Sequence, residues 1–290
     1  MEILKRRKSG KLLSLEALMR RLPESDREYD YYKEMYFSQK KGYEGERYTN
    51  QLWKEIEMPS PHFLFHSLEP INQAGNSHQI DTLLLTPHFI WLLEIKNIGG
   101  RIDIDESKHQ MIRTKQEGTI ESFRNPVNQI KRHAHFVNGL MREIGISIPI
   151  EYAIVIVSDS TIIGSVPREV SIFHASGLHA EVSRLLGKYK EKQITALQLN
   201  YVMKDLMKRH SPKSWKPKID FSKLRRGVLC EKCEYKSVMV FEHGRFICPK
   251  CSFKSNEAHL QALLDYRYLC NEWITNRELR DYLNIDSRMQ

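Results

Sequence analysis

The sequence has no apolar run long enough to span a lipid bilayer, which argues against a membrane-spanning protein. Its first residues, Met1-Glu-Ile-Leu-Lys-Arg-Arg-Lys-Ser9, lack the apolar stretch of a secretory signal. Cysteine is scarce, with five in 290 residues, and we see no internal repeat or low-complexity segment. We therefore expect a cytoplasmic protein with no membrane partner.

The composition is that of a globular protein with an excess of positive charge. Apolar residues make up 41% of the chain and aromatic residues 10%, which is enough for one substantial core with small satellites. The net charge of +9 favours an anionic partner, of which nucleic acid is the commonest. The alternative is that the lysines serve only solubility.

Four of the five cysteines form the most specific local pattern in the chain. Cys230 and Cys233 make one Cys-x-x-Cys pair, Cys248 and Cys251 make the other, and fourteen residues separate the pairs. This spacing is typical of a zinc ribbon, in which four thiolates hold one structural Zn²⁺ and leave no position open for water. The alternative is two disulfides in a secreted domain. The fifth cysteine, Cys270, is expected to be a small buried residue.

Composition and pattern divide the chain into five consecutive segments. They are an N-terminal helical arm at 1–40, an α/β domain at 41–200, a basic linker at 201–226, the zinc ribbon at 227–256 and a helical tail at 257–290. The cations between Lys204 and Arg226 form either a solvated tether or a strip that contacts phosphates. Four cations of the ribbon are also expected to bind nucleic acid: Lys232, Lys236, Arg245 and Lys250.

A predicted hairpin carries the charged residues that suggest chemistry. Residues 79–97 are rich in β-branched, aromatic and aliphatic residues and predict two strands joined at Pro87-His88. A turn centred there places Asp81 directly across from Glu94, and Lys96 on the same face. Two opposed carboxylates suit a hard divalent cation, Mg²⁺ or Mn²⁺. The alternative is a simple salt bridge between Asp81 and Lys96, with Glu94 at the rim.

Four short motifs in this order resemble the nuclease-related domain (NERD) family of the restriction-endonuclease-like PD-(D/E)xK nucleases. They are Gly42-Tyr-Glu-Gly-Glu46, Gln79-Ile-Asp81, Glu94-Ile-Lys-Asn97 with Gly100, and Asn125-Pro-Val-Asn-Gln129. The resemblance covers roughly residues 40–160, and some members of the family also carry a C-terminal zinc ribbon. It implies a mixed sheet flanked by helices, with the small zinc ribbon and the helical tail added to this α/β fold.

The resemblance also implies roles for individual residues. Asp81 and Glu94 would bind Mg²⁺ or Mn²⁺, with the carbonyl of Ile95 as a third ligand. Lys96 would orient or deprotonate water, or neutralise charge on the phosphate, and a pKa lowered by burial beside a metal would favour the action on water. Glu46 would complete the metal shell, and Gln129 would hold Lys96 or the water by its amide. From the sequence alone, the alternative for Glu46 is an ordinary exposed helix residue, and the alternative for Gln129 is a surface residue.

Further patterns complete the expected fold. Tyr152–Val157 and Val170–Phe173 predict strands, and residues 127–142, 178–187 and 193–208 predict helices over the sheet. In the tail, Thr275 and Glu278 predict a capping box. The lone His133 is expected to be packed rather than catalytic.

The leading functional hypothesis is a metal-dependent nuclease whose zinc ribbon assists binding of nucleic acid, with DNA favoured. A binding module with little turnover and a protein-docking scaffold remain as alternatives.

Overall fold

A computed structural model describes residues 1–285, which fall into two compact units. The first unit contains Met1–Arg7 and Lys41–Pro212, and the second contains Lys8–Lys40 and the chain from Lys213 onward. Helix α2 (Tyr29–Trp53) contributes residues to both. Among the described residues, no helix combines the length and apolarity that a membrane span requires.

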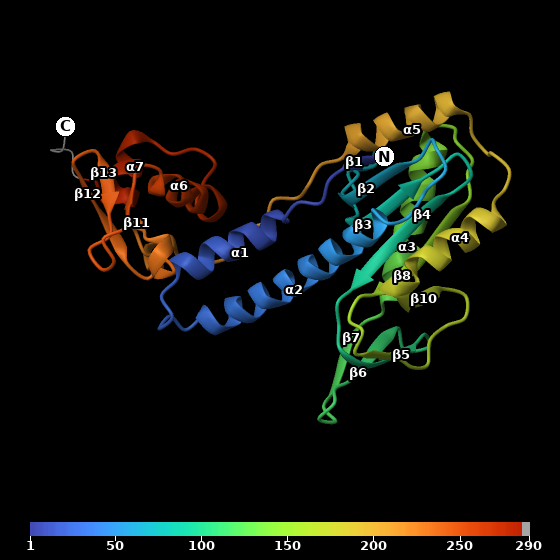
Figure 1. Ribbon diagram of the computed structural model, residues 1–290, viewed down its shortest axis with the longest axis horizontal. Helices are drawn as coiled ribbons and strands as arrows, with labels where there is room; N and C mark the ends of the chain where they lie inside the picture. The colour runs from blue at the N-terminus through green and yellow to red at the C-terminus, as the bar shows by residue number, and fades with distance from the viewer. Residues whose placement is uncertain (286–290) are drawn as a thin grey trace. The chain divides into compact units, whose positions relative to one another are not determined.

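A mixed six-stranded sheet forms the centre of the first unit (Figure 1). In spatial order it contains β1 (Glu2–Leu4), β2 (Phe63–Leu68), β3 (Ile80–Leu85), β4 (Ile90–Lys96), β8 (Ile150–Ile156) and β10 (Ser171–His174). The pairs β2–β3 and β3–β4 are antiparallel, whereas β1–β2, β4–β8 and β8–β10 are parallel. This arrangement confirms the predicted mixed sheet and both strands predicted after residue 150.

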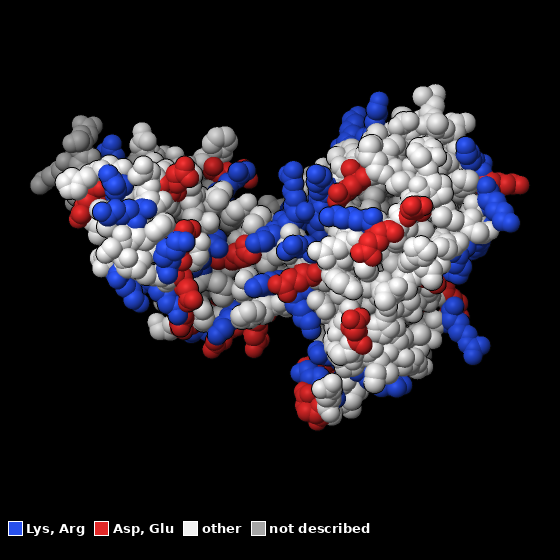
Figure 2. Space-filling view, in the orientation of Figure 1, with Lys and Arg blue, Asp and Glu red and all other residues white. Residues whose placement is uncertain are grey.

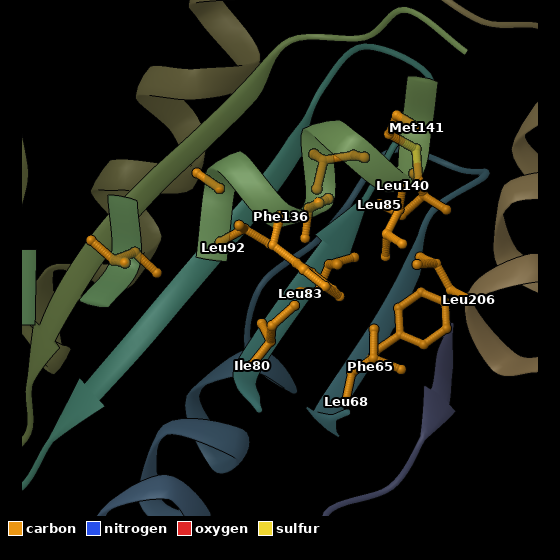
Figure 3. Packing of buried hydrophobic residues seen from close by; sticks show 14 of the residues in the cluster. Phe65, Leu68, Ile80, Leu83, Leu85, Leu92, Phe136, Leu140, Met141 and Leu206 are labelled. Atoms are coloured by element: carbon orange, nitrogen blue, oxygen red, sulfur yellow. The ribbon is translucent and has the colours of Figure 1, made fainter. Parts of the chain in front are cut away.

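Helices cover both faces of this sheet because its strands are apolar on both sides. On one face, α3 (Pro126–Glu143) and α5 (Ala196–Arg209) pack against a cluster that includes Leu83 and Leu92. Figure 3 shows Leu83, Leu85 and Leu92 facing the α3 side chains Phe136, Leu140 and Met141. On the other face, α4 (Leu178–Lys188) and the end of α2 pack against a second cluster. The three predicted covering helices are thus confirmed.

A second, four-stranded sheet was not predicted from the sequence. It contains, in spatial order, β7 (Ile120–Arg124), β6 (Gln110–Thr114), β5 (Gly100–Asp105) and β9 (Thr161–Ile163). Its outer strand β7 is largely exposed and has no clear apolar alternation, so its sequence carries little signal of a strand.

The second unit combines the N-terminal arm with the C-terminal part of the chain. Its elements are α1 (Gly10–Arg21), the first part of α2, the antiparallel strands β11 (Val228–Leu229), β12 (Val238–Glu242), β13 (Arg245–Ile247) and β14 (Lys254–Ser255), and helices α6 (Ala258–Leu269) and α7 (Asn276–Leu283). The predicted capping box is present, since Glu278 N donates to Thr275 Oγ1 at 3.3 Å and Thr275 N to Glu278 Oε2 at 2.8 Å. Two short 3₁₀ turns of this unit occupy Phe221–Lys223 and Glu231–Cys233, and another, at Ala175–Gly177, belongs to the first unit.

The two units differ from the five consecutive segments expected from sequence. Residues 8–40 belong with the C-terminal part, and 201–209 continue helix α5 rather than forming a linker. The physical reason is a buried ion cluster: Asp265 of α6 accepts hydrogen bonds from Arg20 at 2.7 Å and from Arg21 at 2.8 Å. Arg21 is 1% exposed and also donates to the carbonyl of Gly227 at 2.6 Å.

Candidate functional site

The hairpin of β3 and β4 has the register predicted from sequence. Thr82 pairs with Leu93 and Leu85 with Ile90, and the same register continued by one residue would place Asp81 opposite Glu94. Asp81 Oδ2 also accepts a hydrogen bond from the backbone N–H of Ile95 at 2.8 Å. Asp81, Glu94 and Lys96 therefore continue the row of side chains that, closer to the turn, forms the apolar core beneath α3.

Glu94 and Lys96 form an ion pair on this row, in which Glu94 is buried and Lys96 is partly exposed. Lys96 Nζ donates to Glu94 Oε1 at 2.6 Å and to Gln129 Oε1 at 3.3 Å. Glu94 is 2% exposed, and its second oxygen, Oε2, has no hydrogen-bond partner among residues 1–285. A buried carboxylate oxygen without a donor is costly, so this atom points to a ligand that the protein alone does not supply.

Gln129 reaches Lys96 because α3 begins in a defined way. Asn125 caps the helix by accepting from Val127 N at 2.8 Å, and Pro126 occupies the first turn, where it has no hydrogen bond to lose. The Asn-Pro pair thus fixes the start of α3 three residues before Gln129. His133, one turn further, is 6% exposed and packs edge-on against His78, which agrees with its exclusion from the site.

Glu46 enters from α2 and is held by a residue that the sequence analysis missed. Arg6 donates to Glu46 Oε2, to Ser67 Oγ at 2.9 Å and to the carbonyl of Asp81 at 2.8 Å. Its guanidinium also donates to Asn50, and the side chain is only 2% exposed. Arg6 lies in a run of four cations, Lys5 to Lys8, and charge alone does not distinguish it from its neighbours.

Two motif glycines have steric reasons, and one of them connects the first motif with the third. A Cβ on Gly45 would lie 2.6 Å from the Cβ of Asn97, so α2 approaches β4 closely only because residue 45 has no side chain. Asn97 in turn donates to the carbonyl of Lys41 at 2.8 Å. Gly100 has a φ of +90°, and a Cβ there would lie 2.5 Å from the carbonyl oxygen of Thr114. The first and third motifs therefore form one contact that positions Glu46.

The electrostatics of the site show a shortage of positive charge. Burial raises the pKa of Glu94 to about 8 and that of Glu46 to about 7, and the charge of Asp81 adds to both effects. Burial lowers the pKa of Lys96, but Glu94 and Asp81 outweigh it, so the pKa of this ammonium lies above its ordinary value. The lowered pKa expected for Lys96 concerns the metal-bound site and stays a prediction, whereas without a metal the adjacent carboxylates stabilise the charged form.

The carboxylates offer the donor atoms that a divalent cation prefers, although among residues 1–285 only the four cysteines bring three or more ligand atoms within 4.8 Å of one another. Asp81, Glu94 and Glu46 offer hard oxygen atoms of the kind that Mg²⁺ and Mn²⁺ prefer, and Glu94 Oε2 has no other partner among the described residues. Because their pKa values are raised, Glu94 and Glu46 retain protons at neutral pH. A bound divalent ion would replace the positive charge of these protons.

The four cysteines converge as their spacing predicts. Their sulfur atoms lie within 4.8 Å of one another, with Cys230 Sγ 3.6 Å from Cys251 Sγ and Cys233 Sγ 3.8 Å from Cys248 Sγ. Zinc–sulfur bonds of about 2.3 Å in a tetrahedron place sulfur atoms about 3.8 Å apart. The cluster can therefore hold one metal ion, and the surrounding strands are consistent with a zinc ribbon.

The cations expected to contact nucleic acid differ in how far they are engaged. Lys232, Lys236, Arg245 and Lys250 are all exposed on the ribbon, but Lys232 lies 3.8 Å from Glu231 and Lys236 lies 3.7 Å from Glu24. In the basic segment, Arg209 pairs with Asp205 and Glu143 at 2.6 Å, and Lys223 pairs with Glu28 at 2.8 Å. Several cations of that segment are thus paired within the fold. The segment therefore does not present a continuous strip of unpaired cations.

Comparison with known proteins gives one match. Residues 41–157 match the family model NERD, the nuclease-related domain. Neither the curated proteins nor the solved structures contain a match to the chain. The matched range includes all four motifs and the residues that converge on the β3–β4 hairpin, except Arg6. The chain therefore carries a nuclease-related domain of the NERD family.

Proposed function

We propose that the protein is a metal-dependent nuclease that hydrolyses phosphodiester bonds of nucleic acid, with DNA favoured as the substrate. The observation that supports this most is the group of Asp81, Glu94 and Lys96, in which Glu94 Oε2 has no partner among the described residues. A core has no structural use for opposed carboxylates, whereas a metal-dependent phosphodiesterase requires them.

Asp81, Glu94 and the backbone carbonyl of Ile95 would hold Mg²⁺ or Mn²⁺, with Glu46 alongside. When bound, such an ion supplies Lewis acidity toward a phosphate oxygen and lowers the pKa of water. Lys96 is protonated and held between Glu94 and Gln129, so its role is to neutralise charge that develops on the phosphate. Gln129 fixes the direction of the ammonium, and Arg6 fixes Glu46.

The Cys₄ cluster would hold a structural Zn²⁺, and the ribbon would assist substrate binding through Lys232, Lys236, Arg245 and Lys250. These point charges suit phosphates rather than bases, so binding should depend on salt and show little sequence preference. Replacing all four by Gln should reduce the log–log salt slope by roughly 0.9 for each duplex phosphate that the ribbon no longer neutralises. An unchanged slope would remove the ribbon from the binding surface.

The experiment that tests the catalytic assignment is cleavage of plasmid DNA, single-stranded DNA and RNA with Mg²⁺ or Mn²⁺. Glu94→Gln keeps the size of the side chain but removes its charge, and it should lower the rate by about 10³-fold or more, since a Lewis acid contributes several kcal/mol. The matched control is Glu169→Gln, at an exposed position of the same unit. Equal rates for parent and Glu94→Gln would show that the site is assigned wrongly.

A second candidate is a nucleic-acid-binding module with little turnover. One observation favours it: Glu94 pairs with Lys96 and Glu46 pairs with Arg6, so cations of the chain already compensate part of the negative charge. Absence of cleavage by the parent on all three substrates, together with salt-dependent binding, would support this candidate over the first.

A further inference from the structure

A cavity of about 450 Å³ lies directly beside the candidate site, among β1, β2 and the C-terminal end of α2. Arg6 lines this cavity while its guanidinium donates to Glu46 and to the carbonyl of Asp81. All of the lining residues belong to the first unit. Arg6 therefore connects the cavity with the carboxylates, because it lines the one and binds the other.

The lining of the cavity is rich in cations that no carboxylate neutralises. Lys5, Arg47 and Lys54 are exposed, and none of them has a carboxylate oxygen within 4.0 Å among residues 1–285. The acidic side chain that lines the cavity, Glu2, lies 3.7 Å from His66 instead. Figure 2 shows basic side chains gathered over the region where Figure 1 places β1, β2 and the end of α2. The cavity thus favours an anion.

The two histidines of the lining do not supply this charge at neutral pH. Burial lowers the pKa of His66 to about 3 and also lowers the pKa of His62. His66 is therefore neutral, and its Nδ1 lies 3.2 Å from Thr82 Oγ1. The positive charge of the cavity therefore comes from its lysines and arginines.

The rest of the lining combines aromatic and apolar side chains with the amides of Asn50 and Gln51. Trp53 is 7% exposed, and its indole Nε1 has no hydrogen-bond partner in the described part of the chain. Tyr43 is half-buried, and Leu64 and Leu84 also line the cavity. Aromatic rings beside cations are what nucleotides require, because a base packs against a ring while its phosphate meets the cations.

The volume decides how much of a nucleic acid this cavity can hold. It lies within the range of roughly 300–1,000 Å³ found for small-molecule sites, which suits about one nucleotide rather than a strand running through. We propose that the cavity binds the terminal, phosphate-bearing nucleotide of a nucleic-acid strand, with Lys5, Arg47 and Lys54 facing the phosphate. This inference rests on the proposed function, because the strand whose end the cavity holds would continue toward Asp81 and Glu94.

The test is equilibrium binding of labelled single-stranded oligonucleotides without added Mg²⁺ or Mn²⁺, so that cleavage does not enter the result. Three probes of one sequence are compared: one with a 5′-phosphate, one with a 3′-phosphate and one with neither. One of the two terminal phosphates should tighten binding to the parent by about tenfold, the gain expected when a phosphate meets two or three cations.

Arg47→Gln/Lys54→Gln should abolish this gain, because both side chains line the cavity. The matched control is Lys190→Gln/Lys192→Gln, which removes two exposed lysines of the same unit that do not line it. All four positions are exposed, so thermal melting should show that both variants fold as the parent does. A gain that survives Arg47→Gln/Lys54→Gln, or no gain from either terminal phosphate, overturns the proposal.

A free nucleotide presents the same chemistry and is tested separately by calorimetry with 5′- and 3′-deoxynucleoside monophosphates. Binding of a monophosphate to the parent but not to Arg47→Gln/Lys54→Gln, without any gain from a strand-end phosphate, overturns the strand-end assignment in favour of a free nucleotide. The outcome is independent of the proposed activity. Cleavage without preference for a phosphorylated end leaves the nuclease proposal standing, and end-phosphate binding without cleavage leaves this one standing.

Discussion

At the scale of single residues, two cations balance the carboxylates of the candidate site. Lys96 holds Glu94, and Arg6 holds Glu46 and the backbone of Asp81. Arg6 lies outside the range matched by the NERD family, so this chain completes its site with a residue from before the domain. Arg6 is buried and Lys96 is partly buried, and the loss of either would leave an acidic partner without compensation.

Replacing Arg6 by Ala should lower the free energy of unfolding of the first unit by about 2–4 kcal/mol, because the buried Glu46 and the carbonyl of Asp81 lose their donor. The same change should reduce nuclease activity, since Glu46 is then free to turn away. Urea unfolding and the cleavage assay measure the two effects. Arg7→Ala is the control, as Arg7 is exposed and adjacent. Equal effects of the two variants would show that Arg6 has no special role.

His133 predicts a pH dependence of stability. Burial lowers its pKa to about 4, below the value of about 6.5 in an unfolded chain. Between these two values the unfolded state binds the proton more readily, so the stabilisation associated with neutral His133 is complete above pH 6.5 and is lost as the pH falls toward 4.

We therefore expect the difference in unfolding free energy between the parent and His133→Phe to be constant above pH 7. Below pH 6 it should shift against the parent by about 1.4 kcal/mol per pH unit. Urea titrations of both proteins from pH 7.5 to 4.5 measure this difference, in which contributions of the other groups cancel. A difference that stays constant over the whole range would mean that His133 is accessible to protons in the fold.

At the scale of elements, the site depends on how closely α2 approaches β4. The contact is between Gly45 and Asn97, and Glu46 follows Gly45 directly. The Gly-x-x-Gly-Glu motif therefore acts as a packing motif that places a carboxylate, and its two glycines are not equivalent. A Cβ on Gly45 would collide with Asn97, whereas a Cβ on Gly42 has nothing within 4 Å among the described residues.

Gly45→Ala should displace α2 and lower activity by about 10- to 100-fold, as expected for a misplacement on the order of 1 Å. Gly42→Ala should leave activity unchanged and stabilise the helix by up to about 1 kcal/mol. Steady-state cleavage rates and melting temperatures of the two variants distinguish these effects. Activity reduced equally in both would indicate a general requirement for a flexible helix.

The second unit depends on the contact between α1 and α6. Asp265 is 1% exposed and accepts from both Arg20 and Arg21, so its removal leaves the buried Arg21 without an anion. Asp265→Ala should destabilise this unit by about 3–5 kcal/mol. Hydrogen exchange should then accelerate in α1 and α6 but not in the central sheet of the first unit. Asp281→Ala, at an exposed position of α7, is the control and should change neither.

At the scale of the whole molecule, the two units have separate cores, so they should respond differently to loss of a metal. The Cys₄ cluster lies in a core that also contains Ala262 of α6 and Tyr282 of α7. The central sheet has its own apolar clusters on both faces. Damage to the metal cluster should therefore extend into the C-terminal helices and stop short of the nuclease-related domain.

Chelation should release one Zn²⁺ per chain and unfold the ribbon, because so small a core is not stable without its metal. Protection against hydrogen exchange should fall in β11–β14, α6 and α7 and persist in β2, β3, β4 and β8. Elemental analysis gives the zinc content, and exchange mass spectrometry locates the change. A protein prepared under reducing conditions that holds no zinc would contradict this prediction.

The sequence by itself determined the features that follow from local spacing. A two-residue strand period and one turn position were sufficient for the register of the β3–β4 hairpin, and Cys-x-x-Cys spacing was sufficient for the metal cluster. The tertiary structure alone decided that Arg6 enters the site, that residues 8–40 pack with the C-terminal part, and that a cationic cavity lies beside Glu46. These depend on contacts between residues far apart in the chain. A run of like cations such as Lys5 to Lys8 looks uniform in sequence, and only packing decides which one of them is buried against a carboxylate.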